Sequence, residues 1–191
     1  MERFLSVQEL KRLGGALEEE RARYPIHTAA VLLILFSGCR SSEILGLHWS
    51  DVRGRRLHLR DSKTGPRTVW ICDEGRAVLD GIVRRRKVEP VFYNWSTGRP
   101  IGTLDYYWAR IREKTGFSSL RLHDLRHTYA SHAAALSETL PIIGKLLGHR
   151  EVRSTARYTH NDDVDVLRTA DTVGAAIARL TAVASAGVLF K

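Results

Sequence analysis

The chain has 191 residues with a formal net charge of +9 and an isoelectric point near 10.0, and 43% of its residues are hydrophobic. This length and composition are typical of a soluble globular protein with one domain. Two cysteines are too few for a disulfide scaffold and fit a cytoplasmic protein, and the longest apolar run, residues 29–36, is far shorter than the roughly 20 residues of a membrane span.

The excess positive charge lies in the middle of the chain. The first 50 residues are neutral overall, residues 51–158 carry a net charge of +10, and the remainder carries −1. A basic zone flanked by neutral ends favours a nucleic acid as partner. The same side chains could equally form an ordinary solvated surface.

The first predicted element is a helix that begins with a capping box at Ser6 and Glu9 and ends near Arg23. A second helix, around residues 27–36, has no polar face and is therefore predicted to be buried, with Gly38 ending it. After Gly38, Ser41 or Ser42 is predicted to cap a short helix.

The pattern changes after residue 50. Residues 57–60 and 67–71 are typical of β-strands, and residues 61–66 between them are turn formers. This segment predicts a β-hairpin or small sheet within a helical protein.

The rest of the chain is predicted to be helical. One expected helix is capped by Asp73 and runs to about Lys87, and others run over residues 103–114, 123–136 and 139–147, and from about residue 162 to 185. The predicted fold class is therefore mainly α with a small antiparallel β-sheet or hairpin. Residues 1–191 are expected to form a single domain, because no linker divides them.

Arg40 lies at the junction of two predicted helices, in the segment Ser-Gly-Cys-Arg-Ser-Ser-Glu-Ile. A guanidinium group beside the free amides of a helix start suits a phosphate, and Glu43 could hold Arg40 in place. An arginine at a helix junction is more commonly a surface or capping residue.

The segment His-Asp-Leu-Arg-His places His123 and Arg126 on one helix face, a proton donor or acceptor beside an anion binder. His123 and His127 also have the spacing of a zinc-binding helix. Asp124 replaces the glutamate of that motif, and Arg126 would crowd a dication, so no metal is expected.

Three more residues could carry chemistry. His149 follows Gly148 in the turn after a predicted helix, and Tyr158 lies nine residues further on. Lys63 lies at the tip of the predicted hairpin, where it could donate a proton. Each has an ordinary interpretation, because turn lysines are usually solvated and tyrosines in polar stretches usually lie at the surface.

In this order, these segments resemble the C-terminal catalytic domain of the tyrosine recombinases, the phage integrase and Xer-like family, over about residues 5–165. The resemblance implies the catalytic-domain fold of that family, site-specific cutting and rejoining of double-stranded DNA, and no metal or other cofactor. The catalytic residues that it implies are Arg40, Lys63, His123, Arg126, His149 and Tyr158.

The resemblance also implies a role for each of these residues. Arg40 and Arg126 would clamp the scissile phosphate, which His149 would also hydrogen-bond. Tyr158 would attack the phosphorus to give a 3′-phosphotyrosyl enzyme, and Lys63 would protonate the leaving 5′ oxygen. A further expectation is that His123 helps to deprotonate the tyrosine.

Several alternatives stay open at this point. The N-terminal core-binding domain usual in the family is expected to be absent, so the chain is either a fragment or a naturally short form. The last helix folds back onto its own core or packs on a neighbouring protomer of a synaptic tetramer. Other possible functions are DNA relaxation of the type IB topoisomerase kind, DNA binding without catalysis, and zinc-dependent hydrolysis at His123 and His127.

Overall fold

The computed structural model describes residues 3–60, 65–136, 140–147 and 163–183. Its helices, in chain order, are α1 (Val7–Arg21), α2 (Pro25–Ser37), α3 (Ser41–Leu45), α4 (Asp73–Asp80), α5 (Asp105–Thr115), α6 (Leu122–Ala135), α7 (Leu140–Leu147) and α8 (Asp163–Thr181), with one 3₁₀ turn at Trp49–Asp51. The strands β1 (Val52–Arg53), β2 (Arg56–Leu59) and β3 (Arg67–Trp70) form an antiparallel sheet in the order β1-β2-β3. The fold class predicted from the sequence is therefore confirmed. Within the described ranges, no helix is long and apolar enough to cross a bilayer.

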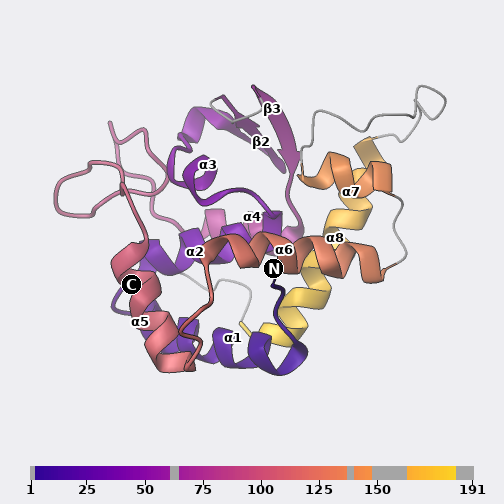
Figure 1. Ribbon diagram of the computed structural model, residues 1–191. Helices are drawn as coiled ribbons and strands as arrows, with labels where there is room; N and C mark the ends of the chain where they lie inside the picture. Colours follow the sequence, from indigo (N-terminus) through magenta and orange to yellow (C-terminus); the bar gives the residue numbers. More distant parts are fainter. Residues whose placement is uncertain (1–2, 61–64, 137–139, 148–162, 184–191) are drawn as a thin grey trace.

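Helix α2 forms the centre of the molecule. It packs against α1, α4, α6 and α8, and Figure 1 shows these helices arranged around it. Eleven of its 13 residues are buried, as expected for a helix without a polar face. Pro25 occupies the first turn, and Gly38 ends the helix with a left-handed φ of 64°, a conformation that glycine adopts at little cost.

The sheet lies on the side of the helical layer that carries α3 and α7 (Figure 1). Strands β2 and β3 pair from Arg56 opposite Trp70 to Leu59 opposite Arg67, so both predicted strands are confirmed to within one residue. The two-residue strand β1 was not predicted, because it is too short to show alternation. Arg67 and Val69 share one face of β3, and Val69 is buried there.

The start of α3 differs from the prediction that Ser41 or Ser42 caps it. The cap is Arg40, whose backbone N–H donates to Oε2 of Glu43 at 2.8 Å. A carboxylate three residues into the helix thus satisfies the amide that a capping box normally serves. The serine prediction was wrong because Glu43 reaches back to an arginine.

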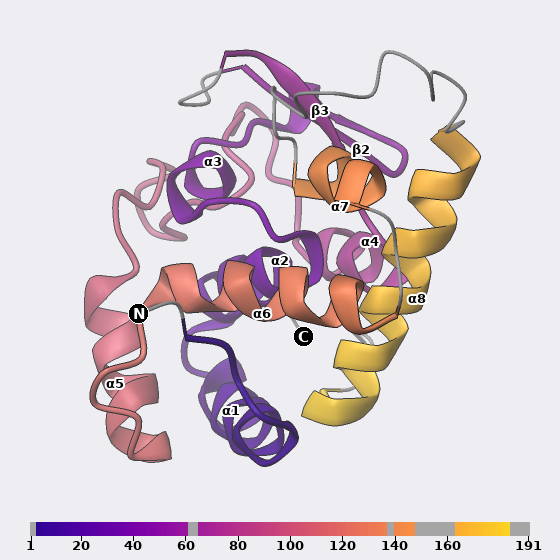
Figure 2. The same cartoon turned by 45° about the vertical axis from the view of Figure 1, so that its right-hand side comes forward.

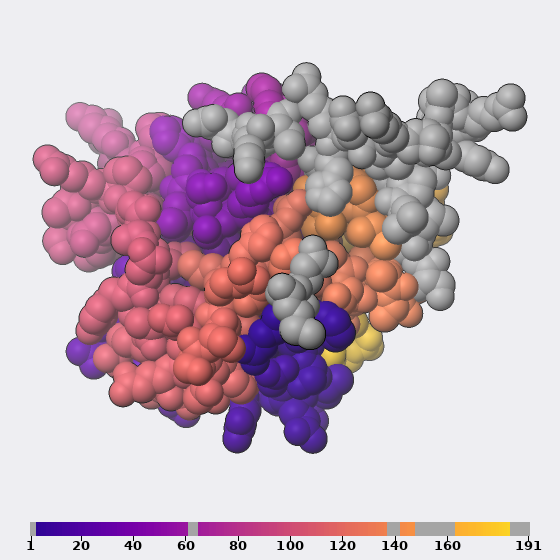
Figure 3. Space-filling view, viewed as in Figure 1, coloured from indigo at the N-terminus to yellow at the C-terminus, as the bar shows by residue number. Residues whose placement is uncertain are grey.

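Helix α4 also begins and ends elsewhere than predicted. Its cap is Cys72, whose sulfur accepts a backbone N–H at 3.3 Å, and Asp73 is the first helical residue. The helix ends at Asp80 because Gly81, a poor helix former, follows. Residues 84–87 are all basic, and they therefore lie in the connection between α4 and α5. This connection projects from one side of the molecule (Figure 3).

Helix α8 packs on its own chain, against α1, α4, α6 and α7. Val166, Ala170, Val173 and Ile177 are buried at helical spacing, whereas Val164 is exposed. These contacts are made by residues 163–181 with the rest of the described chain.

Two glycines permit this close packing. A Cβ at Gly14 of α1 would lie 1.8 Å from the carbonyl oxygen of Thr181, and a Cβ at Gly174 would lie 2.4 Å from the sulfur of Cys72. Both distances are far below van der Waals contact, so only glycine allows the two elements to approach this closely. The neighbouring Gly15 faces open space.

Gly14→Ala is expected to lower the free energy of unfolding by about 1–3 kcal/mol, because the methyl group would overlap backbone atoms that cannot rotate away. Gly15→Ala is the matched control and is expected to raise it by up to about 1 kcal/mol through better helix propensity. Urea unfolding of both variants checks the sign of each change. Equal effects of the two substitutions would contradict the close contact between α1 and α8.

Candidate active site

Arg40 is held at the junction of α2 and α3 by Glu43. The Nη1 of Arg40 donates to Oε1 of Glu43 at 2.9 Å, in addition to the backbone contact at Oε2. The Glu43 side chain is 1% exposed and that of Arg40 is 27% exposed. The prediction that Glu43 holds Arg40 is confirmed, and the guanidinium group remains partly accessible from solvent.

Arg126 lies one turn into α6 and is 6% exposed. Its Nη1 donates to the carbonyl oxygen of Gly38 at 2.5 Å, and its Nη2 donates to that of Leu147 at 3.1 Å. These carbonyls lie at the ends of α2 and α7, where the helix dipole favours a cation. Burial lowers the pKa of Arg126, and the positive charge of Arg40 lowers it further, since the two guanidinium groups are neighbours.

Arg67, at the start of β3, joins the same group of residues. Its Nη2 donates to Oε2 of Glu43 at 2.7 Å, and its Nη1 donates to the carbonyl oxygen of Leu147 at 3.0 Å. The sequence predicted Arg67 only as a strand residue. The alternation along β3, which puts Arg67 on the same face as the buried Val69, is the signal that could have identified it.

We call Arg40, Glu43, Arg67, Arg126 and the Leu147 carbonyl the arginine network. It joins four segments that are distant in sequence: the α2–α3 junction, the start of β3, helix α6 and the end of α7 (Figure 2). It contains three guanidinium groups and one carboxylate, so positive charges exceed negative ones by two. Buried charge is costly unless it is matched, so the network suits an anionic ligand with oxygen acceptors, such as a phosphodiester.

His123 lies one turn before Arg126 on α6. Its ring and that of His127 are nearly perpendicular, with centroids 4.7 Å apart. Burial lowers the pKa of His123, and the neighbouring His127 and Arg126 lower it further, which favours the neutral ring, the form that can accept a proton. In the part of the chain that the structure describes, no group of three or more His, Cys, Asp or Glu side chains is arranged to bind a metal.

Lys63, His149 and Tyr158 lie outside the described residues. Two described residues of the network lie close in sequence to two of these three residues. Arg67 follows shortly after the segment that contains Lys63, and Leu147 lies two residues before His149. The structure thus brings together Arg40, Arg126 and the neighbouring His123, three of the six predicted catalytic residues.

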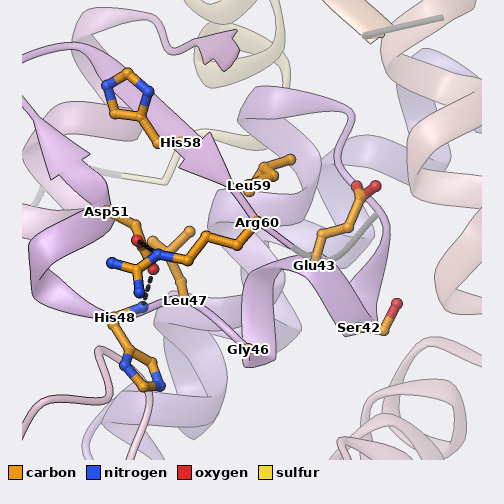
Figure 4. A pocket seen from close by; sticks show the side chains of 9 residues that line it. All are labelled: Ser42, Glu43, Gly46, Leu47, His48, Asp51, His58, Leu59 and Arg60. Atoms are coloured by element: carbon orange, nitrogen blue, oxygen red, sulfur yellow. Dashed lines mark hydrogen bonds and ion pairs between the residues drawn. The ribbon is translucent and has the colours of Figure 1, made fainter. Parts of the chain in front are cut away.

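A cavity of about 530 Å³ adjoins the network at Glu43 (Figure 4). The Asp51 carboxylate, which forms an ion pair with Nε of Arg60 at 2.5 Å, lines another part of its wall. The complete lining is Ser42, Glu43, Gly46, Leu47, His48, Asp51, His58, Leu59 and Arg60. No guanidinium group of the network lines this cavity, so it is distinct from the place where Arg40 and Arg126 meet.

Comparison with known proteins places the chain among others with this architecture. The model of the phage integrase family matches residues 3–164. The chain belongs to the phage integrase family. This family member is 29% identical over 133 residues to the tyrosine recombinase XerA of Saccharolobus solfataricus. The aligned residues make up 68% of this chain and 44% of that relative. It spans about half the length of the curated relatives that it matches.

Solved structures agree with this assignment. The crystal structure of a XerA recombinase matches this chain with a TM-score of 0.63 and 26% identity. The match covers 88% of this chain and 63% of the other. The lambda integrase bound to DNA matches with a TM-score of 0.63 and 22% identity, covering 83% and 60%. The fold is therefore that of a tyrosine recombinase catalytic domain.

Glu43→Gln is expected to lower the free energy of unfolding at pH 7 by about 3–5 kcal/mol, because three guanidinium groups would lose their only carboxylate within the network. Burial raises the pKa of Glu43, but the contacts with Arg67 and Arg40 outweigh it and hold the pKa below its ordinary value of 4.5. The stability that Glu43 supplies is therefore present above pH 4.5 and lost as the pH falls through the lower folded value.

Denaturant unfolding at neutral and acidic pH measures this difference. Glu19→Gln is the control, because Glu19 is exposed and water screens its ion pair with Lys114, so little stability is expected to be lost at either pH. A deficit in Glu43→Gln that stays constant on acidification would contradict the assigned role of the carboxylate.

Proposed function

We propose that this chain is the catalytic part of a site-specific DNA recombinase or integrase that cuts and rejoins DNA through a 3′-phosphotyrosyl intermediate. The arginine network carries the proposal, because it holds Arg40 beside Arg126 in a member of the phage integrase family. A scissile phosphate bound by these guanidinium groups would be stabilised as charge builds up on its oxygens in the transition state. Double-stranded DNA is the proposed substrate, which the charge of +9 favours.

Tyr158 is the proposed nucleophile. Its oxygen attacks phosphorus, a tyrosine–phosphate bond forms, and the bond to the 5′ oxygen breaks. His123 accepts the phenolic proton, a role that its lowered pKa supports, and Lys63 protonates the leaving 5′ oxygen. His149 is proposed to donate a hydrogen bond to the phosphate.

Rejoining reverses these steps. A 5′-hydroxyl from a second duplex attacks the phosphorus, the new phosphodiester forms, and the tyrosine leaves as its oxygen regains a proton. The covalent ester conserves the energy of the original bond, so this scheme assigns no nucleotide or metal cofactor.

A synaptic tetramer on DNA is the proposed assembly, and the cytoplasm is the proposed location. Cys39 and Cys72 are both free and buried, a state that suits a reducing compartment. The matching relatives named above are recombinases and integrases, which favours strand exchange over simple DNA relaxation. Relaxation of supercoiled DNA by the free chain, without paired sites, would instead support a topoisomerase.

Tyr158→Phe is expected to abolish covalent attachment to DNA, because phenylalanine has no oxygen to attack phosphorus. The substrate is a pool of nicked duplexes with randomised sequence around the nick, from which the cut fragment diffuses away and traps the intermediate. Labelled DNA that migrates with the protein in a denaturing gel measures the adduct.

The wild-type chain is expected to form this adduct in the presence of a chelator, whereas loss of the adduct with chelator would favour the zinc alternative. An adduct in Tyr158→Phe would show that another residue is the nucleophile. DNA binding by the wild type without any adduct would support a non-catalytic DNA-binding module.

At subsaturating DNA, the rate of adduct formation is expected to fall as the pH is lowered, because protonated His123 cannot accept a proton. Since the pKa of His123 is lowered, the apparent pKa of this fall is expected to lie below the ordinary histidine value of 6.5. Arg126 and Arg121 also lower this pKa and Asp124 raises it. His127→Gln removes one of the groups that lower it, so the acidic limb is expected to move to higher pH. A limb that stays in place, or moves to lower pH, would contradict the role of His123 as the base.

A further inference from the structure

We infer that Arg67 is a positioning residue of the active site, which holds Arg40 and Arg126 in register with each other. The inference rests on the proposed function and deepens it. Arg67 ties Glu43, which holds Arg40, to the carbonyl oxygen of Leu147, which Arg126 also binds.

The contacts form one continuous chain of hydrogen bonds. From Arg40 it passes at 2.9 Å to Glu43, and from Glu43 at 2.7 Å to Arg67. It continues from Arg67 at 3.0 Å to the Leu147 carbonyl, which accepts from Arg126 at 3.1 Å. Arg67 is the middle member, and among the contacts described here it provides the hydrogen-bonded connection between the two proposed phosphate ligands.

The guanidinium group of Arg67 is used for protein contacts rather than presented to a ligand. Nη1 and Nη2 each donate to a different acceptor, and the side chain is 10% exposed, against 27% for Arg40. Its Nε is buried and has no hydrogen-bond partner among the described residues. This arrangement makes Arg67 a residue that acts through Glu43 and Leu147, and not a third phosphate ligand.

Only arginine can make this connection. Its planar guanidinium group carries separate nitrogens in a rigid fork, so one side chain can donate to two acceptors in fixed directions. A lysine at position 67 would retain the charge but would present a single nitrogen to Glu43 and Leu147. Arg67→Lys is therefore expected to separate the effect of charge from the effect of bridging.

The location of Arg67 extends its influence to the other proposed catalytic residues. It begins β3, a few residues after Lys63 in the chain. Its acceptor Leu147 is the last residue of α7, and Gly148 and His149 follow it in the chain. Loss of Arg67 would release the end of α7 from β3, and displacements of about 1 Å in an active site can cost about a hundredfold in rate.

The experiment compares Arg67→Gln with a matched control, Arg55→Gln. Arg55 also donates to one backbone carbonyl, that of Ile71 at 3.0 Å, and to the carboxylate of Asp171, and it forms a second ion pair with the exposed Asp73 at 3.1 Å. Its side chain is 23% exposed, so both substitutions remove a partly buried arginine with the same kinds of partner. The readouts are the single-turnover rate of adduct formation at saturating DNA, the DNA dissociation constant and the thermal unfolding midpoint, measured on duplexes recovered from the wild-type adduct.

Arg67→Gln is expected to slow adduct formation at least thirtyfold while the dissociation constant changes less than threefold. Arg55→Gln is expected to cut within twofold of the wild-type rate. Arg67→Lys is included in case Arg67→Gln does not fold. Its rate of adduct formation is expected to lie between those of Arg67→Gln and the wild type. The double variant Glu43→Gln/Arg67→Gln is expected to be no slower than the slower single variant, because both act through the same connection.

A wild-type rate in Arg67→Gln or Arg67→Lys would overturn the inference, as would equal slowing in Arg67→Gln and Arg55→Gln, or additive effects in the double variant. The proposed function is judged separately in the same assay. A wild-type chain that never traps DNA would refute that function, whereas trapping that depends on Tyr158 but not on Arg67 would refute only the role of Arg67.

Discussion

The arginine network of the candidate active site depends on the hydrogen bonds and ion pairs that its arginines make with the buried carboxylate of Glu43. Arginine side chains from different parts of the fold repel one another when they are brought together away from water. Glu43 offsets part of this repulsion by accepting hydrogen bonds from the backbone and side chain of Arg40 and from Arg67. The positive charge that remains in the network is the property that an incoming phosphate would use.

Helix ends supply the rest of the support for this charge. Helix α2 ends at Gly38 and helix α7 ends at Leu147, and the buried carbonyls of both residues accept hydrogen bonds from Arg126. Carbonyls at helix C-termini carry partial negative charge, so they stabilise a guanidinium group without adding a titratable acid. The central helix α2 therefore contributes to the site as well as to the core.

The same packing also affects His123. Burial, together with the neighbouring His127 and Arg126 on α6, holds the pKa of its imidazole below the ordinary value. The close approach of α8 to α1, permitted by Gly14, completes the core that surrounds α2.

Local patterns determined the helices, the hairpin and the segments that contain Arg40, His123 and Arg126, because periodicity, capping residues and short spacings act over a few residues of chain. Tertiary structure alone decided the partners of Arg67, which lie 24 and 80 residues away, and the packing of α8 within the chain. It also made Arg40, and not a serine, the cap of α3, because the Glu43 carboxylate accepts the backbone N–H of Arg40. These contacts depend on which distant segments pack together in the core, and the spacing of residues along the chain does not determine that.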